Sequence, residues 1–301
     1  MFRSLLRVGL GILLLLPILI IIEKTTSWEW PPFKELLLAI QFTLLQSLIS
    51  TLATVGVGIF VGIGLLGVQS PANRRTFEVI CLLPGFLPPL MVILPWLQGV
   101  MFFKYHPFGL LGIVVVHAFM NVGVTGVLLA HLLEYKVGSY VELAWVEGAS
   151  RWTLLMRGLV PLLKSDLWAL SFYLFSLFFV SFSVPLILAG PTGVTLEVLI
   201  YEKIRVYGDW GQALSLGVIQ MGMLFLFSVG IKSSFPGESK RKPQMRYLAQ
   251  RSFLLIPLLI SFWVTVGQFQ SVYSGWQEFL LSPLLVEDWV KLIVGTLVVS
   301  L

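Results

Sequence analysis

Long runs of apolar residues, separated by short polar stretches, dominate the chain. Most runs reach the roughly 20 residues that a helix needs to cross a bilayer core about 30 Å thick. Such runs predict helices, because a helix satisfies its own backbone N–H and C=O groups where water is absent. The sequence therefore predicts an all-α integral membrane protein, a polytopic helical bundle of about seven spans plus the start of an eighth. The runs lie near residues 5–22, 37–67, 79–103, 108–133, 167–190, 212–231 and 252–270, and the last begins near 290.

The first run, 5–22, follows Arg3 and Arg7 and could be mistaken for a secretory signal peptide. It has no small-x-small cleavage site and continues past Pro17, so we expect a retained helix. With this amino terminus in the cytoplasm, most of the 20 Lys and Arg residues fall in inward-facing segments. The charge bias predicts that residues 138–165 are cytoplasmic.

Composition agrees with a membrane protein. Hydrophobic residues make up 57% of the chain, charged residues only 12%, and the mean hydropathy is +0.92. The net charge of +5 needs no nucleic acid partner to explain it. The basic run from Lys240 to Arg251 is interpreted as an anchor near anionic lipid head groups.

Few residues show a spacing that is typical of a catalytic, metal-binding or cofactor-binding site. Cys81 is the chain's one cysteine, so neither a disulfide nor a cysteine metal cluster is expected. Gly62 to Gly67 spells GxGxxG, but inside an apolar run this spacing is typical of a close helix-packing face. No phosphate-binding loop occurs. We expect no catalytic residue, no metal site and no cofactor bound by this chain.

The third run contains Pro84, Pro88, Pro89 and Pro95. Each proline removes a backbone donor and clashes with the preceding turn, so this span must be broken or kinked. Irregular backbone at membrane depth persists where it is buried in protein or faces a water-filled cavity. Pro84, Pro88 and Pro89 are therefore candidates for a pathway wall, with a bent packing helix as the alternative.

Small polar residues inside two spans are further candidates for the pathway. Thr43 and Ser47 begin a polar stripe at helical spacing, and His117 lies one turn before Asn121 on one face. Each set could line a path. The alternative is that they form hydrogen bonds to neighbouring helices.

A polar stretch, Glu142–Pro161, interrupts the apolar pattern. Tyr140–Glu147 is predicted to form a short helix that Gly148 ends, and Ser150 to cap a second helix over Arg151–Gly158. The next span is expected to start after Asp166. Two short helices joined by a glycine predict a compact docking element.

Two tryptophans, Trp145 and Trp152, lie in this stretch. Exposed tryptophans are unusual on a free loop, whereas protein interfaces commonly contain aromatic anchors that become buried on binding. They are expected to contact a partner protein.

The spacing Glu142–Ala144, three residues, Gly148, nine residues, Gly158–Pro161 resembles the EAA loop of permease subunits of binding-protein-dependent ABC importers. Leu143, Gly158 and Val160 depart from that pattern. The resemblance implies that the loop docks on a separate ATPase subunit, which uses the ATP. The docking residues implied are Glu142, Ala144, Trp145, Gly148, Trp152 and Pro161.

The resemblance covers about residues 37 to 231. Pro107–Ile113, Ala189–Pro191 and Thr195–Tyr201 are similar to the thiamine and ferric-iron permease branch, more closely to the thiamine type. This resemblance implies the MetI-like permease fold in the inner membrane. It also implies a periplasmic or extracellular substrate-binding protein and a second permease core, fused or as a dimer. The implied substrate is thiamine or a related small solute, with ferric iron as the alternative.

The end of the chain resembles the start of the core. Leu292–Leu301 and Ala39–Leu48 share five identities in ten positions, which indicates the start of a second repeat. The predicted domains are an amino-terminal helix with its outward loop, a permease core, a basic linker and an incomplete second repeat. Their bounds are 1–35, 36–232, 233–251 and 252–301.

Two other classes of function were weighed. A gradient-driven carrier would need an ionisable pair inside the spans, and no Asp, Glu, Lys or Arg lies within the runs given above, where His117 is the main exception. A membrane enzyme would need clustered His, Asp or Glu, and the three histidines have no neighbouring carboxylate cluster. Both classes are disfavoured.

Overall fold

The computed structural model describes residues 29–97, 108–229 and 250–281, where every regular element is helical. Five helices there are long and apolar enough to cross a bilayer, and a pair bent by 82° makes a sixth crossing if its two helices form one span. The predicted helical bundle is confirmed. The predicted first helix, most of the basic linker and the eighth span lie outside the described residues. The six crossings are Phe33–Leu66, Pro71–Phe86 with Pro89–Leu97, Leu110–Val137, Arg157–Phe179, Trp210–Ser228 and Arg251–Gly275.

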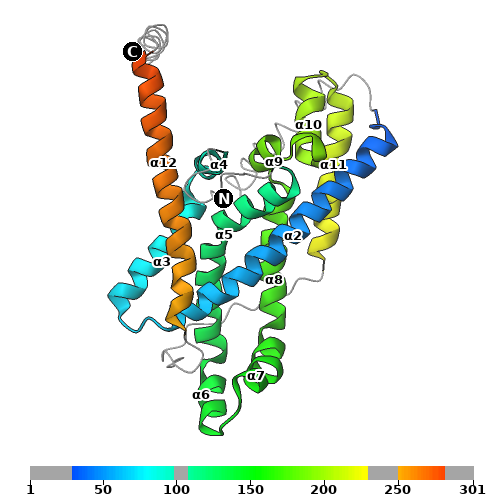
Figure 1. Cartoon of the computed structure of the whole chain (residues 1–301). Coiled ribbons are helices and arrows are strands. Elements are labelled where there is room, and N and C mark those ends of the chain that lie inside the picture. Colours follow the sequence, from blue (N-terminus) through cyan, green and yellow to red (C-terminus); the bar gives the residue numbers. More distant parts are fainter. Residues whose placement is uncertain (1–28, 98–107, 230–249, 282–301) are drawn as a thin grey trace, which may run out of the picture.

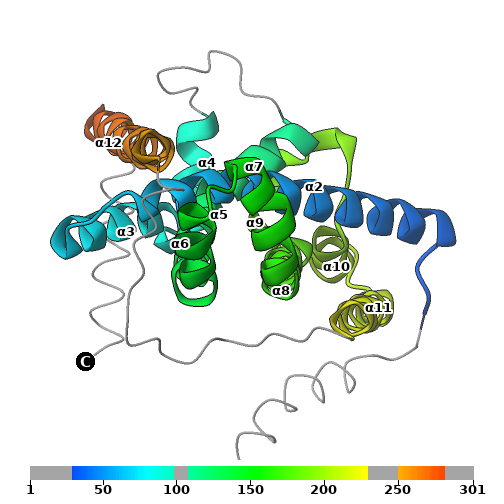
Figure 2. The same cartoon turned by 90° about the horizontal axis from the view of Figure 1, so that it is seen from below.

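The long helix α2 (Phe33–Leu66) crosses the bundle diagonally and packs on α5 (Leu110–Leu132) and α8 (Val160–Phe179) (Figure 1). On the other side of α5, α3 (Pro71–Phe86) packs between it and α12 (Leu255–Leu281). Viewed along the bundle, α5 and α8 lie beneath α2 (Figure 2). The apolar faces of these helices meet in the core.

Small residues allow α2 and α5 to approach closely. A Cβ added to Gly58 would lie 2.5 Å from a methyl carbon of Thr125, and one added to Gly62 would lie 3.1 Å from the carbonyl oxygen of Gly126. Backbones come this close only where side chains are minimal. The predicted glycine packing face is confirmed.

The third span is broken, as its prolines predict. Helix α3 ends at Phe86, and after Leu87 and Pro88 the chain resumes as α4 (Pro89–Leu97), at 82° to α3. Pro88 cannot donate a helical hydrogen bond and disfavours helical backbone at Leu87, where ψ is 144°. Pro84 is buried inside α3, and its role in a pathway, like that of Pro88 and Pro89, stays a prediction.

Helix α3 rests directly on the backbone of α5. A Cβ added to Gly123 would lie 1.8 Å from the carbonyl oxygen of Cys81. No side chain larger than hydrogen fits there. The two helices are therefore in contact through their main chains.

Three α-helices and a short 3-10 helix gather at one end of the bundle, called here the α10 end. Thr195 accepts a hydrogen bond from the backbone N–H of Val198, and α10 follows directly. Asp209 caps α11 in the same way, through the N–H of Gln212 at 2.9 Å. The elements are α9 (Ser183–Leu188), η3 (Gly190–Thr192), α10 (Leu196–Arg205) and α11 (Trp210–Ser228).

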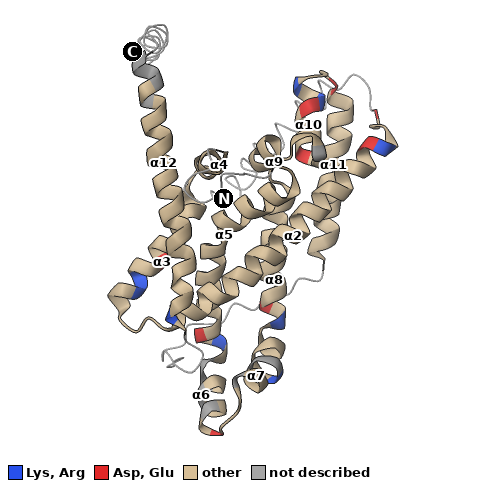
Figure 3. Cartoon of the chain, viewed as in Figure 1, with Lys and Arg blue, Asp and Glu red and all other residues tan. Residues whose placement is uncertain are grey.

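Charged residues gather mainly at the two ends of the bundle, while the middle is apolar (Figure 3). The prediction that no Asp, Glu, Lys or Arg lies within a span needs correction, because the long helices continue beyond the predicted ends. Glu134 and Lys136 extend the α5 span, and Asp166 lies within the span that contains α8. All three lie near the end opposite α10, called here the loop end.

Candidate functional site

A helical hairpin of residues 133–159 projects from the loop end (Figure 1). The two predicted short helices are present, but each continues a long helix. The helix α5 runs through η1 into α6, and α7 runs through η2 into α8, so no helix begins after Asp166, where the next span was expected to start. The elements are η1 (Leu133–Val137), α6 (Gly138–Val146), α7 (Arg151–Thr153) and η2 (Leu154–Leu159).

Gly148 forms the turn at the tip of the hairpin. Its φ of 71° is left-handed, and the N–H of Ala149 donates to the carbonyl of Ala144 at 2.9 Å. This six-to-one bond after a left-handed residue is the Schellman ending of a helix, which glycine adopts without steric cost. The predicted stop at Gly148 is confirmed.

The second limb of the hairpin begins at Ser150. Its hydroxyl accepts a hydrogen bond from the N–H of Thr153 at 3.1 Å, as the predicted cap requires. Leu154 and Leu159 are buried in the core cluster that also contains Val141 of the first limb. The two limbs therefore share one apolar seam.

Large apolar side chains face outward at the tip. Tyr140 and Leu143 are more than half exposed, Val146 is 81% exposed and Trp152 is 68% exposed. Exposed apolar patches of this kind are typical of interaction surfaces. Trp152 is one of these exposed side chains, and its role in docking stays a prediction.

The remaining predicted docking residues fall in different places. Ala144 is partly buried against the core. Pro161 is exposed in the first turn of α8, within a continuous helix instead of leading into one. The backbones of Glu142 and Trp145 lie in α6, and their side chains are outside the described part of the structure.

Each limb of the hairpin contains a π-helical turn, η1 and η2, where it joins its long helix. In η2 the cause is local: Pro161 has no N–H to donate to the carbonyl four residues earlier, and its ring crowds that carbonyl. Single π turns inside α-helices are rare and are found mostly at functional sites.

An ion pair joins the two limbs at their base. The Nζ of Lys136 in η1 lies 2.5 Å from the Oδ2 of Asp166 on α8. The side chain of Asp166 is only 3% exposed and that of Lys136 is 27% exposed. Sequence reasoning missed this pair, although both residues lie where an apolar run meets the polar stretch.

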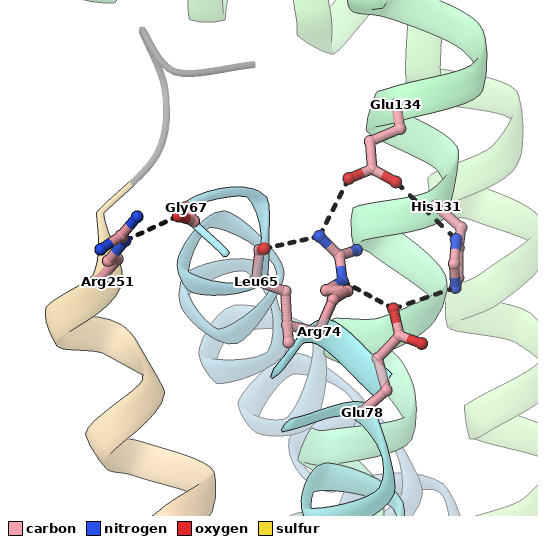
Figure 4. Close-up of polar contacts among 7 residues, drawn as sticks. All are labelled: Leu65, Gly67, Arg74, Glu78, His131, Glu134 and Arg251. Atoms are coloured by element: carbon pink, nitrogen blue, oxygen red, sulfur yellow. Dashed lines mark hydrogen bonds and ion pairs between the residues drawn. The ribbon is translucent and has the colours of Figure 1, made fainter. Parts of the chain in front are cut away.

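A second charged cluster surrounds Arg74 on α3 (Figure 4). The guanidinium donates to Glu78 Oε1 at 2.7 Å, to Glu134 Oε1 at 3.0 Å and to the carbonyl of Leu65 at 2.6 Å. His131 lies 3.6 Å from Glu78 and 4.0 Å from Glu134. The cluster links α2, α3 and the first limb of the hairpin. It corrects the expectation that no histidine has neighbouring carboxylates, because packing brings Glu78 and Glu134 to His131.

Thr43 and Ser47 are fully buried within the bundle. Thr43 donates to the carbonyl of Ala39 and accepts a hydrogen bond from the N–H of Leu196, at the start of α10. Ser47 donates to the carbonyl of Thr43 and accepts from Gln46. Their hydroxyls therefore serve helix contacts, and a role as pathway wall stays a prediction.

His117 connects three parts of the bundle. Its Nδ1 lies 3.2 Å from the hydroxyl of Ser50 on α2, its Nε2 lies 3.0 Å from that of Ser181, and its ring stacks on Phe178. Asn121 donates to the carbonyl of His117 within α5. His117 thus bonds neighbouring helices, and its role in a pathway stays a prediction, as does that of Asn121.

At the α10 end a groove of about 510 Å³ lies between α2 and the chain before α10. Glu35 in its wall pairs with Lys203 at 2.9 Å. Nearby on α10, burial raises the pKa of Glu197 above its ordinary value, and a hydrogen bond from Gln220 opposes this to a smaller degree. This end therefore carries partly shielded carboxylates.

No protein-family model matches the chain. The chain is 27% identical over 217 residues to the thiamine transport system permease protein ThiP of Escherichia coli (strain K12), covering 66% of this chain and 40% of that protein. It is 26% identical over 197 residues to ThiP of Salmonella typhimurium (strain LT2), covering 60% of this chain and 37% of that protein. The chain thus spans about two-fifths of the length of these relatives.

Among solved structures, the fold is similar to a chain of a bacterial ABC transporter involved in the import of the acidic polysaccharide alginate. The TM-score is 0.52 at 17% sequence identity, and the match covers 75% of this chain and 91% of that chain. The resemblance to ABC importer permeases of the thiamine type, inferred from the sequence, is confirmed.

Proposed function

We propose that the chain forms the membrane-spanning path of an ABC importer for thiamine or a related small solute. A separate ATPase subunit binds and hydrolyses ATP, and its docking on the hairpin shifts the population of two membrane states. The observation that carries this proposal is the hairpin itself, an exposed apolar tip on two limbs that continue membrane-spanning helices. Both relatives described above are thiamine permeases, which favours thiamine over ferric iron.

In this proposal the loop end is cytoplasmic and the α10 end faces the side from which the solute arrives. A substrate-binding protein delivers the solute at the α10 end, and a second permease core, fused or as a dimer, completes the path. The ion pairs near the loop end do not support a gradient-driven carrier, because Lys136 and Asp166 pair with each other beside the hairpin instead of standing alone in the apolar middle.

The docking step is tested with two matched glycines. Gly148 and Gly208 both have left-handed backbone, at φ of 71° and 68°, and neither has any atom within 4 Å of an added Cβ. Gly148 lies at the tip of the hairpin and Gly208 at the α10 end. Replacing either with Arg adds the same side chain and the same local strain at opposite ends of the bundle.

The measurement is the amount of ATPase subunit that co-purifies with the full-length protein from cells that express both. We expect Gly148→Arg to abolish capture and Gly208→Arg to leave it intact. If Gly148→Arg captures as much ATPase as the unsubstituted protein, the hairpin is not the docking site. Stimulation of ATP hydrolysis by thiamine in the complex with its binding protein tests the solute separately.

A further inference from the structure

Arg74 joins three segments, of which the hairpin lies 60 residues away in the sequence (Figure 4). It lies in the first turn of α3 and donates to the carbonyl of Leu65 near the end of α2, which also accepts from the N–H of Val68. A cation is also favoured at this end of a helix by the helix dipole. The same guanidinium holds Glu134 of the hairpin at 3.0 Å. One side chain therefore ties α2, α3 and η1 together.

These contacts are partly shielded from water. The side chains of Arg74, Glu78 and Glu134 are each one-fifth exposed or less. Ion pairs in such surroundings are stronger and less screened by salt than pairs at the open surface. The planar guanidinium also fixes the direction of each hydrogen bond, which an ammonium group would not do. The contact can therefore carry a displacement from one segment to the other.

The position of Glu134 in η1 places it at a junction. Two residues further along, Lys136 points to a different neighbour and pairs with Asp166 on α8. The π turn thus carries one charged link to α3 and another to α8. Any displacement of this limb acts on both helices.

Helix α3 leads from this junction to the break in the third span. Its 16 residues extend about 24 Å, and beyond Phe86 the chain turns by 82° into α4. Between its ends, the contact of Cys81 with Gly123 keeps α3 on the backbone of α5. The break therefore lies at the far end of a helix whose first turn is held by the hairpin.

We propose that Arg74 is a positioning residue that makes the broken span α3–α4 follow the hairpin through its contact with Glu134. This inference rests on the proposed function, because it gives the route by which motion at the docking site reaches the membrane part. Arg74 contacts neither the solute nor the ATPase. Its loss is expected to uncouple ATP hydrolysis from transport while docking persists.

The test compares Arg74→Gln with Arg75→Gln in the full-length protein, assembled with its ATPase and binding protein in liposomes. Arg75 is the next residue on α3, carries the same charge and is exposed. We expect Arg74→Gln to capture a normal amount of ATPase but to take up about tenfold less radiolabelled thiamine per ATP hydrolysed, a change within the range for single residues in coupling networks. Arg75→Gln is expected to keep the normal ratio.

A rescue experiment exchanges the two charges in a double variant, Arg74→Glu with Glu134→Arg. Each single reversal should lower the ratio of uptake to hydrolysis, and the double reversal should restore much of it, since the pair is re-formed in the opposite sense. If Arg74→Gln lowers the yield of folded protein, Glu134→Gln tests the same contact from the other side with an isosteric side chain.

The outcomes separate this inference from the proposed function. If docking is intact and Arg74→Gln has the same ratio as Arg75→Gln, the inference is wrong and the proposed function stands. A double reversal no better than either single one would overturn it as well. If the unsubstituted protein captures no ATPase, the proposed function is wrong and the inference with it.

Discussion

Partly shielded ion pairs join separate helices at the loop end, whereas at the α10 end most hydrogen bonds between helices include a neutral group. At the loop end, Arg74 reaches Glu134 across 60 residues of sequence and Lys136 reaches Asp166 across 30. The first pair connects the hairpin to α3, and the second joins its first limb to α8, which continues its second limb. The hairpin is thereby fixed to α3 and closed at its base.

At the α10 end, Thr195 and Asp209 each cap the helix that follows them. The ion pair of Glu35 with Lys203 crosses between helices; Lys203 is buried, but the side chain of Glu35 is 37% exposed, so water weakens the pair. The other links between helices described here include a neutral group: the N–H of Leu196 donates to Thr43, and the amide of Gln220 donates to Glu197.

The difference shows what each kind of contact achieves. A hydrogen bond with a neutral group adds about 1 kcal/mol, whereas a buried ion pair adds little net stability but restricts the geometry of two elements together. The loop end is therefore the better suited of the two ends to transmit a displacement.

The largest expected effect comes from breaking the ion pair at the base of the hairpin. Lys136→Met leaves the buried carboxylate of Asp166 without its partner, so we expect a loss of about 3 kcal/mol in the free energy of unfolding. Glu35→Leu at the α10 end should cost less, because Lys203 keeps its contact with the ring of Tyr207. Thermal unfolding in detergent, followed by circular dichroism, measures both; equal losses would contradict the difference between the ends.

The exposed tip should matter for binding and not for folding. We expect Trp152→Asp to weaken ATPase capture by about tenfold, equivalent to about 1.4 kcal/mol, since aromatic anchors dominate interfaces. Tyr207→Asp is the control, because Tyr207 is 69% exposed at the α10 end. Titration of the purified ATPase against each variant gives the affinity. A weakened affinity in both variants, or in neither, would argue against a docking surface confined to the hairpin.

Two glycine substitutions compare local packing at the two ends. A Cβ at Gly193 would lie 2.3 Å from the ring of Phe42, so Gly193→Ala must displace that ring and should cost about 1 kcal/mol. A Cβ at Gly158 in the hairpin would lie 3.3 Å from a terminal methyl carbon of Leu154, which can move aside. Gly158→Ala should therefore be neutral or slightly stabilising. Melting temperatures of the two variants check this order. A larger loss of stability for Gly158→Ala than for Gly193→Ala would contradict it.

The smallest expected effect concerns pH at the α10 end. Because burial raises the pKa of Glu197, the folded protein holds that proton more tightly than the unfolded chain does. Stability from this group is present below its unfolded pKa and is lost as pH rises through the folded pKa. Glu197→Gln removes this loss and can retain a hydrogen bond to Gln220.

We therefore expect Glu197→Gln to melt at a slightly higher temperature than the unsubstituted protein at pH 7. Its melting temperature should also fall less between pH 5 and pH 7. The measurement is a series of thermal unfolding curves across that range, with Glu202→Gln as the control on the same helix. Identical pH profiles for all three proteins would refute the assignment.

The features that could be predicted from the sequence are those encoded within a few residues. The cap at Ser150, the stop at Gly148, the cap at Thr195 and the break at Pro88 each depend on one residue and its immediate neighbours. The apolar runs likewise located six described crossings, because their length is dictated by the bilayer.

The contacts that hold the hairpin could not be predicted in the same way. Arg74 has several carboxylates within reach in principle, and only the packing of α3 on α5 selects Glu134. The helix ends could not be predicted either. The sequence predicts a span that starts after Asp166, but the helix there is continuous. A helix can continue into water once its polar side chains face outward, so the polar stretch of the hairpin did not end the helices.

The close contact of α2 with α5 lies far from the middle of α2. Gly58, at that contact, is 25 residues from Phe33, and this length corresponds to about 38 Å of helix. If α2 pivots as a rigid rod about this point, each 5° of rotation moves its amino-terminal end by about 3 Å. That end carries Ala39 and Thr43, which contact α10. A rotation too small to disturb the packing at the glycines would thus open or close the opposite side of the bundle by the width of a water molecule.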